Sequence, residues 1–180
     1  MNKSGIYLRM LEPEDAKPML DLKLRNRAFS QPFEPIRGDE HYTLEEQMTD
    51  IGNGISAAQQ GTAYIYGVFL TETDELIGRI ALTSVTRGVF QNAYMGYFID
   101  QAHNGRGYAT AAVAEMVGIA FHDLHLHRIQ ASVMPINGRS LRVLEKAGFR
   151  QEGLARRYLK INGQWEDHLL FAITKEDLLS

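Results

Sequence analysis

The residues best placed to do chemistry form a glycine-punctuated turn between an apolar strand and an alanine-rich helix. Residues 100–110 read Asp-Gln-Ala-His-Asn-Gly-Arg-Gly-Tyr-Ala-Thr. Gly105 and Gly107 permit a positive φ and carry no Cβ, so successive backbone N–H groups can face one ligand at the positive end of the helix. This pattern predicts an anion-binding loop, and a diphosphate would fit it. The alternative is an ordinary strand-to-helix turn, because glycine is common in turns.

Two better-known phosphate-binding motifs do not fit this turn. A nucleotide P-loop would need a wider spacing between its glycines and a following Gly-Lys-Ser/Thr. A Rossmann fingerprint would need a third glycine where Thr110 stands. The loop therefore belongs to neither class.

A second motif follows in residues 137–149, which read Asn-Gly-Arg-Ser-Leu-Arg-Val-Leu-Glu-Lys-Ala-Gly-Phe. Gly148 stands where a helix ends in a left-handed residue, and Phe149 begins the next strand, so this part has a structural explanation. Asn137 and Ser140 do not need that explanation. Their ordinary alternatives are a turn or cap residue for Asn137 and a helix residue bonded to backbone for Ser140.

The two motifs together resemble those of the GNAT acetyltransferases. That family has a Gln/Arg-x-x-Gly-x-Gly/Ala loop that holds the pyrophosphate of coenzyme A, and an Asn-x-x-Ser/Ala motif followed by a short helix and Gly-Phe. Residues 7–16, 149–153 and 163–168 are similar to the RimJ/RimL branch, whose members acetylate the N-termini of ribosomal proteins. The resemblance covers nearly the whole chain and implies a single GNAT domain over residues 1–180.

The resemblance implies acetyl-CoA as the acetyl donor and no metal. In the family, the pantetheine arm lies between two splayed strands, and a backbone N–H around Phe98 would face the developing oxyanion. The implied cofactor-binding residues are Phe98, Ile99, Asn104, Gly105, Arg106, Gly107, Tyr108, Ala109, Thr110 and Asn137. The chain departs from the family at the loop's first Gln/Arg, which falls at Ala102. That side-chain contact is in doubt, whereas backbone binding does not require it.

The proton-transfer residues are less well defined. Many members carry a tyrosine that protonates the departing thiolate, but Leu144 occupies its position here, and the resemblance points instead to the hydroxyl of Ser140. Relatives use a glutamate on the strand after Gly-Phe as a base, but residues 155–159 of that strand contain no carboxylate. Candidate bases are Glu34, Glu40, His41, Asp167 and His168. Among these, Glu34 and Asp167 join Ser140 as catalytic candidates, although a structural hydrogen bond would explain Asp167 as well.

Composition restricts the class of protein. A chain of 180 residues with 44% hydrophobic residues buries a core and forms most simply one domain. It has no cysteine, which excludes disulfides, thiolate metal sites and a thiol nucleophile. No apolar run is long enough to span a bilayer and no leader is evident, so we expect a cytoplasmic protein with no membrane contact. The net charge of −3 argues against direct nucleic-acid binding.

Charge is unevenly distributed along the chain. Residues 34–50 carry six carboxylates against Arg37 alone, whereas residues 139–160 are rich in arginine and lysine. Two solvated faces would explain this pattern. Within the GNAT resemblance, however, the acidic segment falls where acceptors are recognised and the basic one follows the coenzyme motif, which suits a basic or amine acceptor.

Periodicity predicts an α+β chain with helices on both sides of a sheet. We expect helices over residues 15–28, from 44 with fraying near Gly52 and Gly54, over 108–123 and over 139–147. We expect strands over 6–11, 63–70, 76–85, 93–99, 128–133, 149–159 and 165–174, with the last hairpin turning at Asn162-Gly163. This order matches the GNAT fold: a mixed, mostly antiparallel sheet of about seven strands flanked by about four helices.

Three functions remain open at this point. The first is acetyl-CoA-dependent acetylation of a protein N-terminal α-amine, with ribosomal proteins the class implied by resemblance. The second is acetylation of a small amine such as a polyamine, amino acid or aminoglycoside. The third is a non-catalytic coenzyme A-binding sensor or interaction protein, because the usual tyrosine is missing and the base is unassigned.

Overall fold

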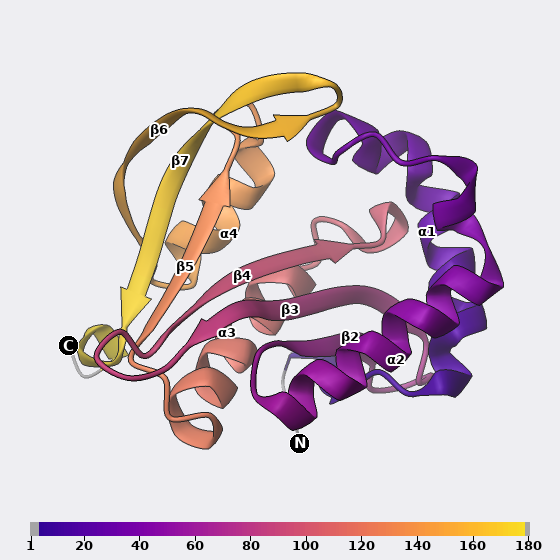
Figure 1. Ribbon diagram of the computed structural model, residues 1–180, viewed down its shortest axis with the longest axis horizontal. Helices are drawn as coiled ribbons and strands as arrows, with labels where there is room; N and C mark the ends of the chain where they lie inside the picture. The colour runs from indigo at the N-terminus through magenta and orange to yellow at the C-terminus, as the bar shows by residue number, and fades with distance from the viewer. Residues whose placement is uncertain (1–3, 179–180) are drawn as a thin grey trace.

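The computed structural model describes residues 4–178, which contain seven strands and four α-helices (Figure 1). The strands are β1 (Ile6–Met10), β2 (Tyr64–Leu70), β3 (Leu76–Thr86), β4 (Asn92–Ile99), β5 (Arg128–Val133), β6 (Arg150–Ile161) and β7 (Gln164–Thr174). The helices are α1 (Ala16–Ser30), α2 (Leu44–Gln60), α3 (Tyr108–Gly118) and α4 (Gly138–Lys146). The predicted order of elements is confirmed.

All seven strands form one sheet in the order β1-β2-β3-β4-β5-β7-β6. Every neighbouring pair is antiparallel except β4 and β5, which are parallel. That parallel register covers only Asn92 with Arg128, Ala93 with Ile129 and Tyr94 with Gln130. Beyond it the two strands diverge, as Figure 1 shows, so the second half of β4 has a partner strand on one side only.

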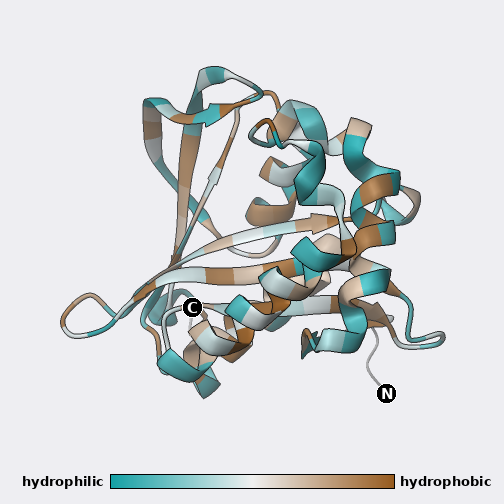
Figure 2. Cartoon of the chain, turned by 45° about the vertical axis from the view of Figure 1, so that its right-hand side comes forward, coloured by the Kyte–Doolittle hydropathy of each residue, from teal (hydrophilic) through white to brown (hydrophobic). Residues whose placement is uncertain are grey.

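Helices cover both faces of the sheet. On one face, α3 packs buried apolar residues such as Val113 and Met116 against the strands. On the other, α1 and α2 enclose a smaller cluster that includes Met19, Leu22 and Ile51. The long helices carry both hydrophobic and hydrophilic residues, as the brown and teal bands in Figure 2 show, because one side of each faces the sheet and the other faces solvent.

One expectation about the helices was wrong, and a second helix has the predicted bounds but changes type near its end. α2 does not fray at Gly52 or Gly54 but continues to Gln60 and ends at Gly61, whose φ is +70°. Gly54 is buried, and a Cβ there would lie 3.3 Å from Ile65, so its lack of a side chain lets α2 approach β2. The helix expected over residues 108–123 is α-helical only to Gly118 and continues as a π-helical turn, Ile119–Asp123, which buries Phe121.

The tip of the last hairpin crosses to the segment after α1. Asn162 and Gly163 form the turn with φ of +45° and +81°, at the predicted position. The N–H of Asn162 donates to the carbonyl of Glu34 at 2.8 Å, and Gln31 donates to the Asn162 side chain at 3.3 Å. Nearby, the Arg139 guanidinium lies over the Phe29 ring at 5.3 Å. These contacts join the two halves of the molecule across the diverging strands.

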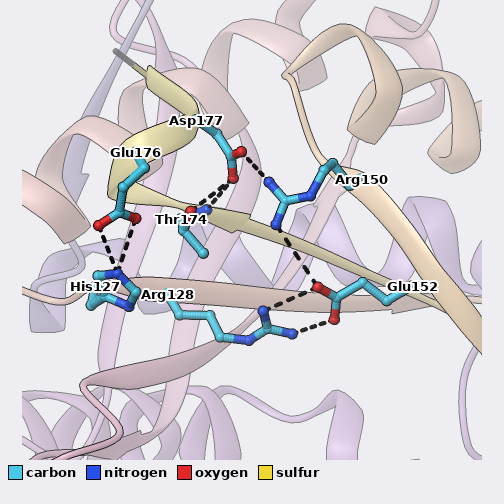
Figure 3. A network of polar contacts seen from close by, with 7 residues as sticks. All are labelled: His127, Arg128, Arg150, Glu152, Thr174, Glu176 and Asp177. Atoms are coloured by element: carbon cyan, nitrogen blue, oxygen red, sulfur yellow. Dashed lines mark hydrogen bonds and ion pairs between the residues drawn. The ribbon is translucent and has the colours of Figure 1, made fainter. Parts of the chain in front are cut away.

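An ion-pair network holds the opposite end, where β4 and β5 still pair (Figure 3). Its members come from the start of β5, the start of β6 and the C-terminal turn: His127, Arg128, Arg150, Glu152, Thr174, Glu176 and Asp177. Arg128 binds Glu152 through both guanidinium nitrogens, and Arg150 contacts Glu152 and Asp177. The network fixes the common end from which the strands diverge.

The far end of β4 is attached to α1 through Asp100. This carboxylate is 3% exposed and accepts hydrogen bonds from Arg25 at 2.7 Å, Asn26 at 3.0 Å and the N–H of Ala102 at 3.2 Å. Asn26 in turn accepts the N–H of Gln101 at 2.8 Å. Burial by itself would raise the pKa of Asp100, but these donors outweigh burial and lower the pKa below its usual value.

We predict that Asp100→Asn lowers the free energy of unfolding by about 2 kcal/mol at pH 7, because hydrogen bonds to a buried charge are lost or weakened. Since the pKa of Asp100 is lower in the folded state, its contribution is present above the unfolded pKa of about 3.9 and is lost as the pH falls further. Urea unfolding at several pH values measures this difference. Asp21→Asn, on an exposed pair with Lys17, is the control. A difference between Asp100→Asn and the parent that does not shrink as the pH falls below about 3.9 would contradict this account.

Candidate active site

The glycine loop connects β4 directly to α3. Gly105 and Gly107 have φ of +78° and +83°, and Gly107 is the N-terminal cap of α3. A Cβ built at either glycine meets no protein atom within 4 Å. Both glycines therefore have the left-handed conformation that the sequence predicts, and the space beside them is open.

The backbone N–H groups of residues 105–110 have no acceptor within the described part of the chain. Three of them begin α3, where the helix dipole adds positive potential. Asn104 does not belong to this set, because its N–H donates to the Gln101 carbonyl at 3.2 Å. The sequence places Asn104 among the cofactor-binding residues, but its N–H is occupied, so the free amides of the loop start at Gly105. The arrangement can bind an anion with several oxygen atoms.

The free edge of β4 lies beside this loop. Asp100 donates its N–H to Ile77 at 2.7 Å, and Phe98 stands opposite Arg79 in the same register. Because hydrogen-bonding direction alternates along an antiparallel strand, the N–H of Phe98 faces β3, and those of Tyr97 and Ile99 face the side of β5. The amide expected around Phe98 is therefore that of a neighbour. Tyr97 and Ile99 lie beyond the paired stretch of β5, so a strand-like ligand can bind there.

The start of α4 lies close to β4 on the other side of the opening. Asn137 caps the helix by accepting the N–H of Ser140 at 3.2 Å. The phenol of Tyr97 donates to the Ser140 carbonyl at 3.4 Å, and burial raises the pKa of Tyr97 to about 12. Among the described residues, no group accepts from or donates to the Ser140 hydroxyl. The alternative in which this hydroxyl bonds backbone is thus not supported.

A cavity of about 580 Å³ opens between α1, α2 and the sheet. Phe98 and Ile65 form part of its apolar wall. Its charged lining has both signs: Glu34, Glu46 and Asp50, together with Lys23, Arg27, Arg37 and Arg79. The acidic segment does border a cavity, but α1 and β3 add cations to it. The inference from that segment alone to a basic acceptor is therefore weakened.

Two of three possible metal ligands at this cavity already contact a cation. His41, Glu46 and Asp50 offer atoms within 4.8 Å of one another. The ammonium of Lys23 lies 3.4 Å from His41 and 3.4 Å from Asp50. Burial first, and then the positive charge of Lys23, lower the pKa of His41, so its imidazole stays neutral to lower pH than usual.

Comparisons with known proteins agree with this geometry. Residues 6–150 match the acetyltransferase (GNAT) domain. The chain is 48% identical to the probable N-acetyltransferase YjcK of Bacillus subtilis, covering 96% of this chain and 95% of that protein. It is 36% identical to the [ribosomal protein uS5]-alanine N-acetyltransferase of Escherichia coli, covering 96% and 89% respectively.

The chain belongs to the GNAT acetyltransferase family. The solved structure of Mycobacterium smegmatis RimJ in complex with CoA-disulfide has a TM-score of 0.93 and 33% identity, covering 98% of this chain and 86% of that chain. The sheet and helices therefore form the GNAT fold, and the protein is an acetyltransferase.

The structure brings several of the predicted GNAT site residues together and leaves one aside. The glycine loop follows β4, and Tyr97 connects β4 with the helix of Ser140. Glu34 lines the cavity. Asp167 does not line it; its carboxylate accepts the N–H of Arg157 at 2.8 Å where the β6–β7 register shifts. This contact favours the structural alternative for Asp167.

Several other residues bear on the proton-transfer candidates. Leu144 is fully buried in the core, in accord with the missing tyrosine acid. Glu40 and His168 do not line the cavity, whereas His41 does. The motifs missed Lys23 and Arg79. A signal for Arg79 was present, because an arginine inside the apolar run of residues 76–82 is unusual unless it has a partner or a function. In the described residues, no helix is both long and apolar enough to cross a membrane.

We predict that Gly107→Ala weakens acetyl-CoA binding by on the order of tenfold or more, because the methyl group enters the space beside the free N–H groups. Gly88→Ala is a matched control: its φ is +70° and its Cβ also meets no protein atom, but it lies in the β3–β4 turn. Both variants should lose similar stability, about 1 kcal/mol, from backbone strain. Calorimetric titration and thermal melting measure the two effects. If Gly107→Ala and Gly88→Ala bind acetyl-CoA with the same affinity, the glycine loop is not part of the acetyl-CoA site.

Proposed function

We propose that the protein binds acetyl-CoA and transfers its acetyl group to a primary amine, most specifically a protein N-terminal α-amine of the ribosomal-protein-alanine type. The observation that carries this proposal is the presence of two neighbouring sets of unpaired backbone donors, Tyr97 and Ile99 on the edge of β4 and residues 105–110 at the start of α3. These donors run from the free edge of one strand to the N-terminus of α3. A pantetheine arm followed by a diphosphate has the matching order of groups.

Each part of the coenzyme has protein groups to hold it. The amides of residues 105–110 would bind the diphosphate, and the exposed guanidinium of Arg106 would add charge. The β4 edge at Tyr97 and Ile99 would pair with pantetheine as another strand does. Asn137 holds the start of α4 and so places Ser140 beside that edge. The thioester supplies an activated acetyl group.

The chemistry requires an oxyanion site, a proton acceptor and a proton donor. The amine nitrogen attacks the thioester carbonyl, the carbon–sulfur bond breaks, the amine loses a proton and the thiolate gains one. The N–H of Tyr97 or Ile99 would stabilise the oxyanion. The free hydroxyl of Ser140 would hydrogen-bond the departing thiolate. Glu34 and neutral His41 both line the cavity and are the candidates for the proton acceptor.

The choice of acceptor rests on chemistry and on relatives. An α-amine has a reference pKa of about 8 and is partly neutral at physiological pH, whereas a lysine at about 10.4 needs a stronger base. A weak base such as Glu34 or His41 is therefore sufficient to deprotonate an α-amine. One relative is named for acetylating the alanine of ribosomal protein uS5. Small amines, and a sensor that binds coenzyme A without turnover, remain the alternative functions.

A turnover assay with acetyl-CoA and a panel of amines tests the proposal. We expect release of free thiol with short peptides that begin with alanine, and kcat/KM for them well above that for spermidine, free amino acids or aminoglycosides. A peptide with a blocked N-terminus and one internal lysine is the control for α-amine selectivity. No thiol release with any amine, despite stabilisation by acetyl-CoA, would support the sensor. A preference for a small amine would support the second alternative.

We predict that Ser140→Ala lowers kcat more than it lowers acetyl-CoA affinity, because a hydrogen bond to the thiolate strengthens only as charge develops in the transition state. The loss should be on the order of ten- to a hundredfold. Ser56→Ala, on the exposed side of α2, is the control for removing a serine hydroxyl. Steady-state kinetics and calorimetry give the two quantities. A loss of affinity with unchanged kcat would make Ser140 a binding residue only.

A further inference from the structure

Arg79 lies on the acceptor side of the proposed site. It stands on β3 directly opposite Phe98 of β4. Directly opposed residues of antiparallel strands point to the same face, with Cβ atoms about 5 Å apart. Both side chains line the cavity between the sheet and helices α1 and α2. The Arg79 guanidinium therefore lies about the length of its own side chain from the part of β4 where the thioester would react.

The guanidinium of Arg79 has no hydrogen bond or ion pair within the described residues. Three arginines on the same side of the sheet each have a carboxylate: Arg9 with Asp15 at 2.8 Å, Arg25 with Asp100 at 2.7 Å and Arg27 with Asp39 at 2.8 Å. Lys23, which also lines the cavity, has Asp50 at 3.4 Å. Arg79 is thus charged, partly buried and unpaired at the same cavity where Lys23 and Arg27 are paired.

Leaving such a group unpaired costs stability. A guanidinium has five N–H donors, and donors withdrawn from water without acceptors are unfavourable. Burial lowers the pKa of Arg79, and Asp50 and Glu34 oppose this only at a distance. Folding alone does not need an arginine here, because an apolar side chain would fit the strand at lower cost. A bound group that accepts from the guanidinium would remove the penalty.

The charge of the cavity indicates which group that is. Four cationic side chains line it, Lys23, Arg27, Arg37 and Arg79, against three carboxylates, Glu34, Glu46 and Asp50. Lys23 is paired with Asp50, and Arg27 is paired with Asp39 beside the cavity, so Arg79 is the partly buried cation of the lining that has no carboxylate partner within the described residues. A singly charged anion balances this one guanidinium, whereas a phosphate dianion would be repelled by Glu34, Glu46 and Asp50. Carboxylate also matches the planar guanidinium through two parallel hydrogen bonds.

We infer that Arg79 is a specificity-determining residue that binds a carboxylate of the acceptor, so that the preferred substrate carries a carboxylate near its reacting amine. The inference rests on the proposed acetyl transfer and extends it to the acceptor. The carboxylate can come from an acidic side chain in the first residues of a protein N-terminus, or from the α-carboxylate of a free amino acid or dipeptide. Both present the same chemistry to Arg79.

The test compares matched pairs of acceptors. Peptides that begin with alanine carry aspartate or asparagine at position two or three, and the free dipeptide Ala-Asp is compared with its C-terminal amide. For the parent protein we expect kcat/KM to favour the carboxylate over its amide isostere by on the order of tenfold or more, with the difference mainly in KM. The position at which the preference is largest distinguishes a side-chain carboxylate from a terminal one.

Variants assign the preference to Arg79. Arg79→Gln should bring the carboxylate-to-amide ratio close to one, and Arg79→Lys should restore part of it. Arg87→Gln removes the same charge from an exposed position in the β3–β4 turn, outside the cavity lining, and should keep the ratio. Thermal melting with acetyl-CoA confirms that each variant is folded and binds the donor. A parent protein without the preference, or an Arg79→Gln variant that retains it, would overturn the inference.

Failure of this inference is distinguishable from failure of the proposed function. Thiol release with any alanine-initiated peptide supports acetyl transfer whatever the ratio shows. If turnover occurs and asparagine peptides react as well as aspartate peptides, Arg79 does not bind a carboxylate but the enzyme assignment stands. If no amine is acetylated, calorimetric titration with the aspartate and asparagine peptides applies the same ratio test to binding alone.

Discussion

β4 and β5 share a register of three residue pairs, and the backbone beyond it has no partner strand on that side. Unpaired peptide groups are costly when buried, so a protein keeps such an edge only if something maintains it. Here the ion pairs of Figure 3 hold the closed end. At the open end, the contact of Asn162 with Glu34 prevents the two halves from moving apart. The hydrogen bond from Tyr97 to Ser140 spans the same opening. The opening between β4 and β5 is therefore supported at both ends, and the backbone N–H groups on this edge of β4 stay without a partner strand.

The glycine loop depends on a second constraint, the placement of Asp100. This carboxylate lies just before the free N–H groups at the start of α3, and it is an anion that could compete for them. Arg25 and Asn26 bind it instead, and they come from α1. Among the backbone N–H groups of the described loop, the Asp100 carboxylate binds only that of Ala102. By satisfying Asp100 from another element, the fold keeps the amides of residues 105–110 available. The glycine loop and α1, which lines the cavity, are in this way structurally coupled.

Sequence patterns predicted most of the framework, because the information is local. Hydrophobic periodicity and turn residues located the strands and helices, and the two motifs located the loop and α4. The errors arose where tertiary contacts decide. Helix α2 continues through Gly54 because a residue without a side chain lets the helix lie close to Ile65. Which N–H around Phe98 faces the gap depends on the register with β3, so the sequence alone does not select Tyr97 and Ile99. The cavity lining has cations as well as carboxylates because Lys23 and Arg79 come from distant segments.

Similarity to relatives explains the glycine loop and the edge of β4 better than it explains the cavity between α1, α2 and the sheet. On the donor side, the groups available to the ligand are mainly backbone N–H groups, and any sequence that preserves the two glycines and the end of β4 can present them. On the acceptor side the lining consists of side chains, of which Arg79 has no partner in the described chain. Backbone recognition fixes the chemistry common to a family, because it is insensitive to most substitutions. Side-chain recognition can change with one residue, so the acceptor has to be inferred from this cavity and its charges.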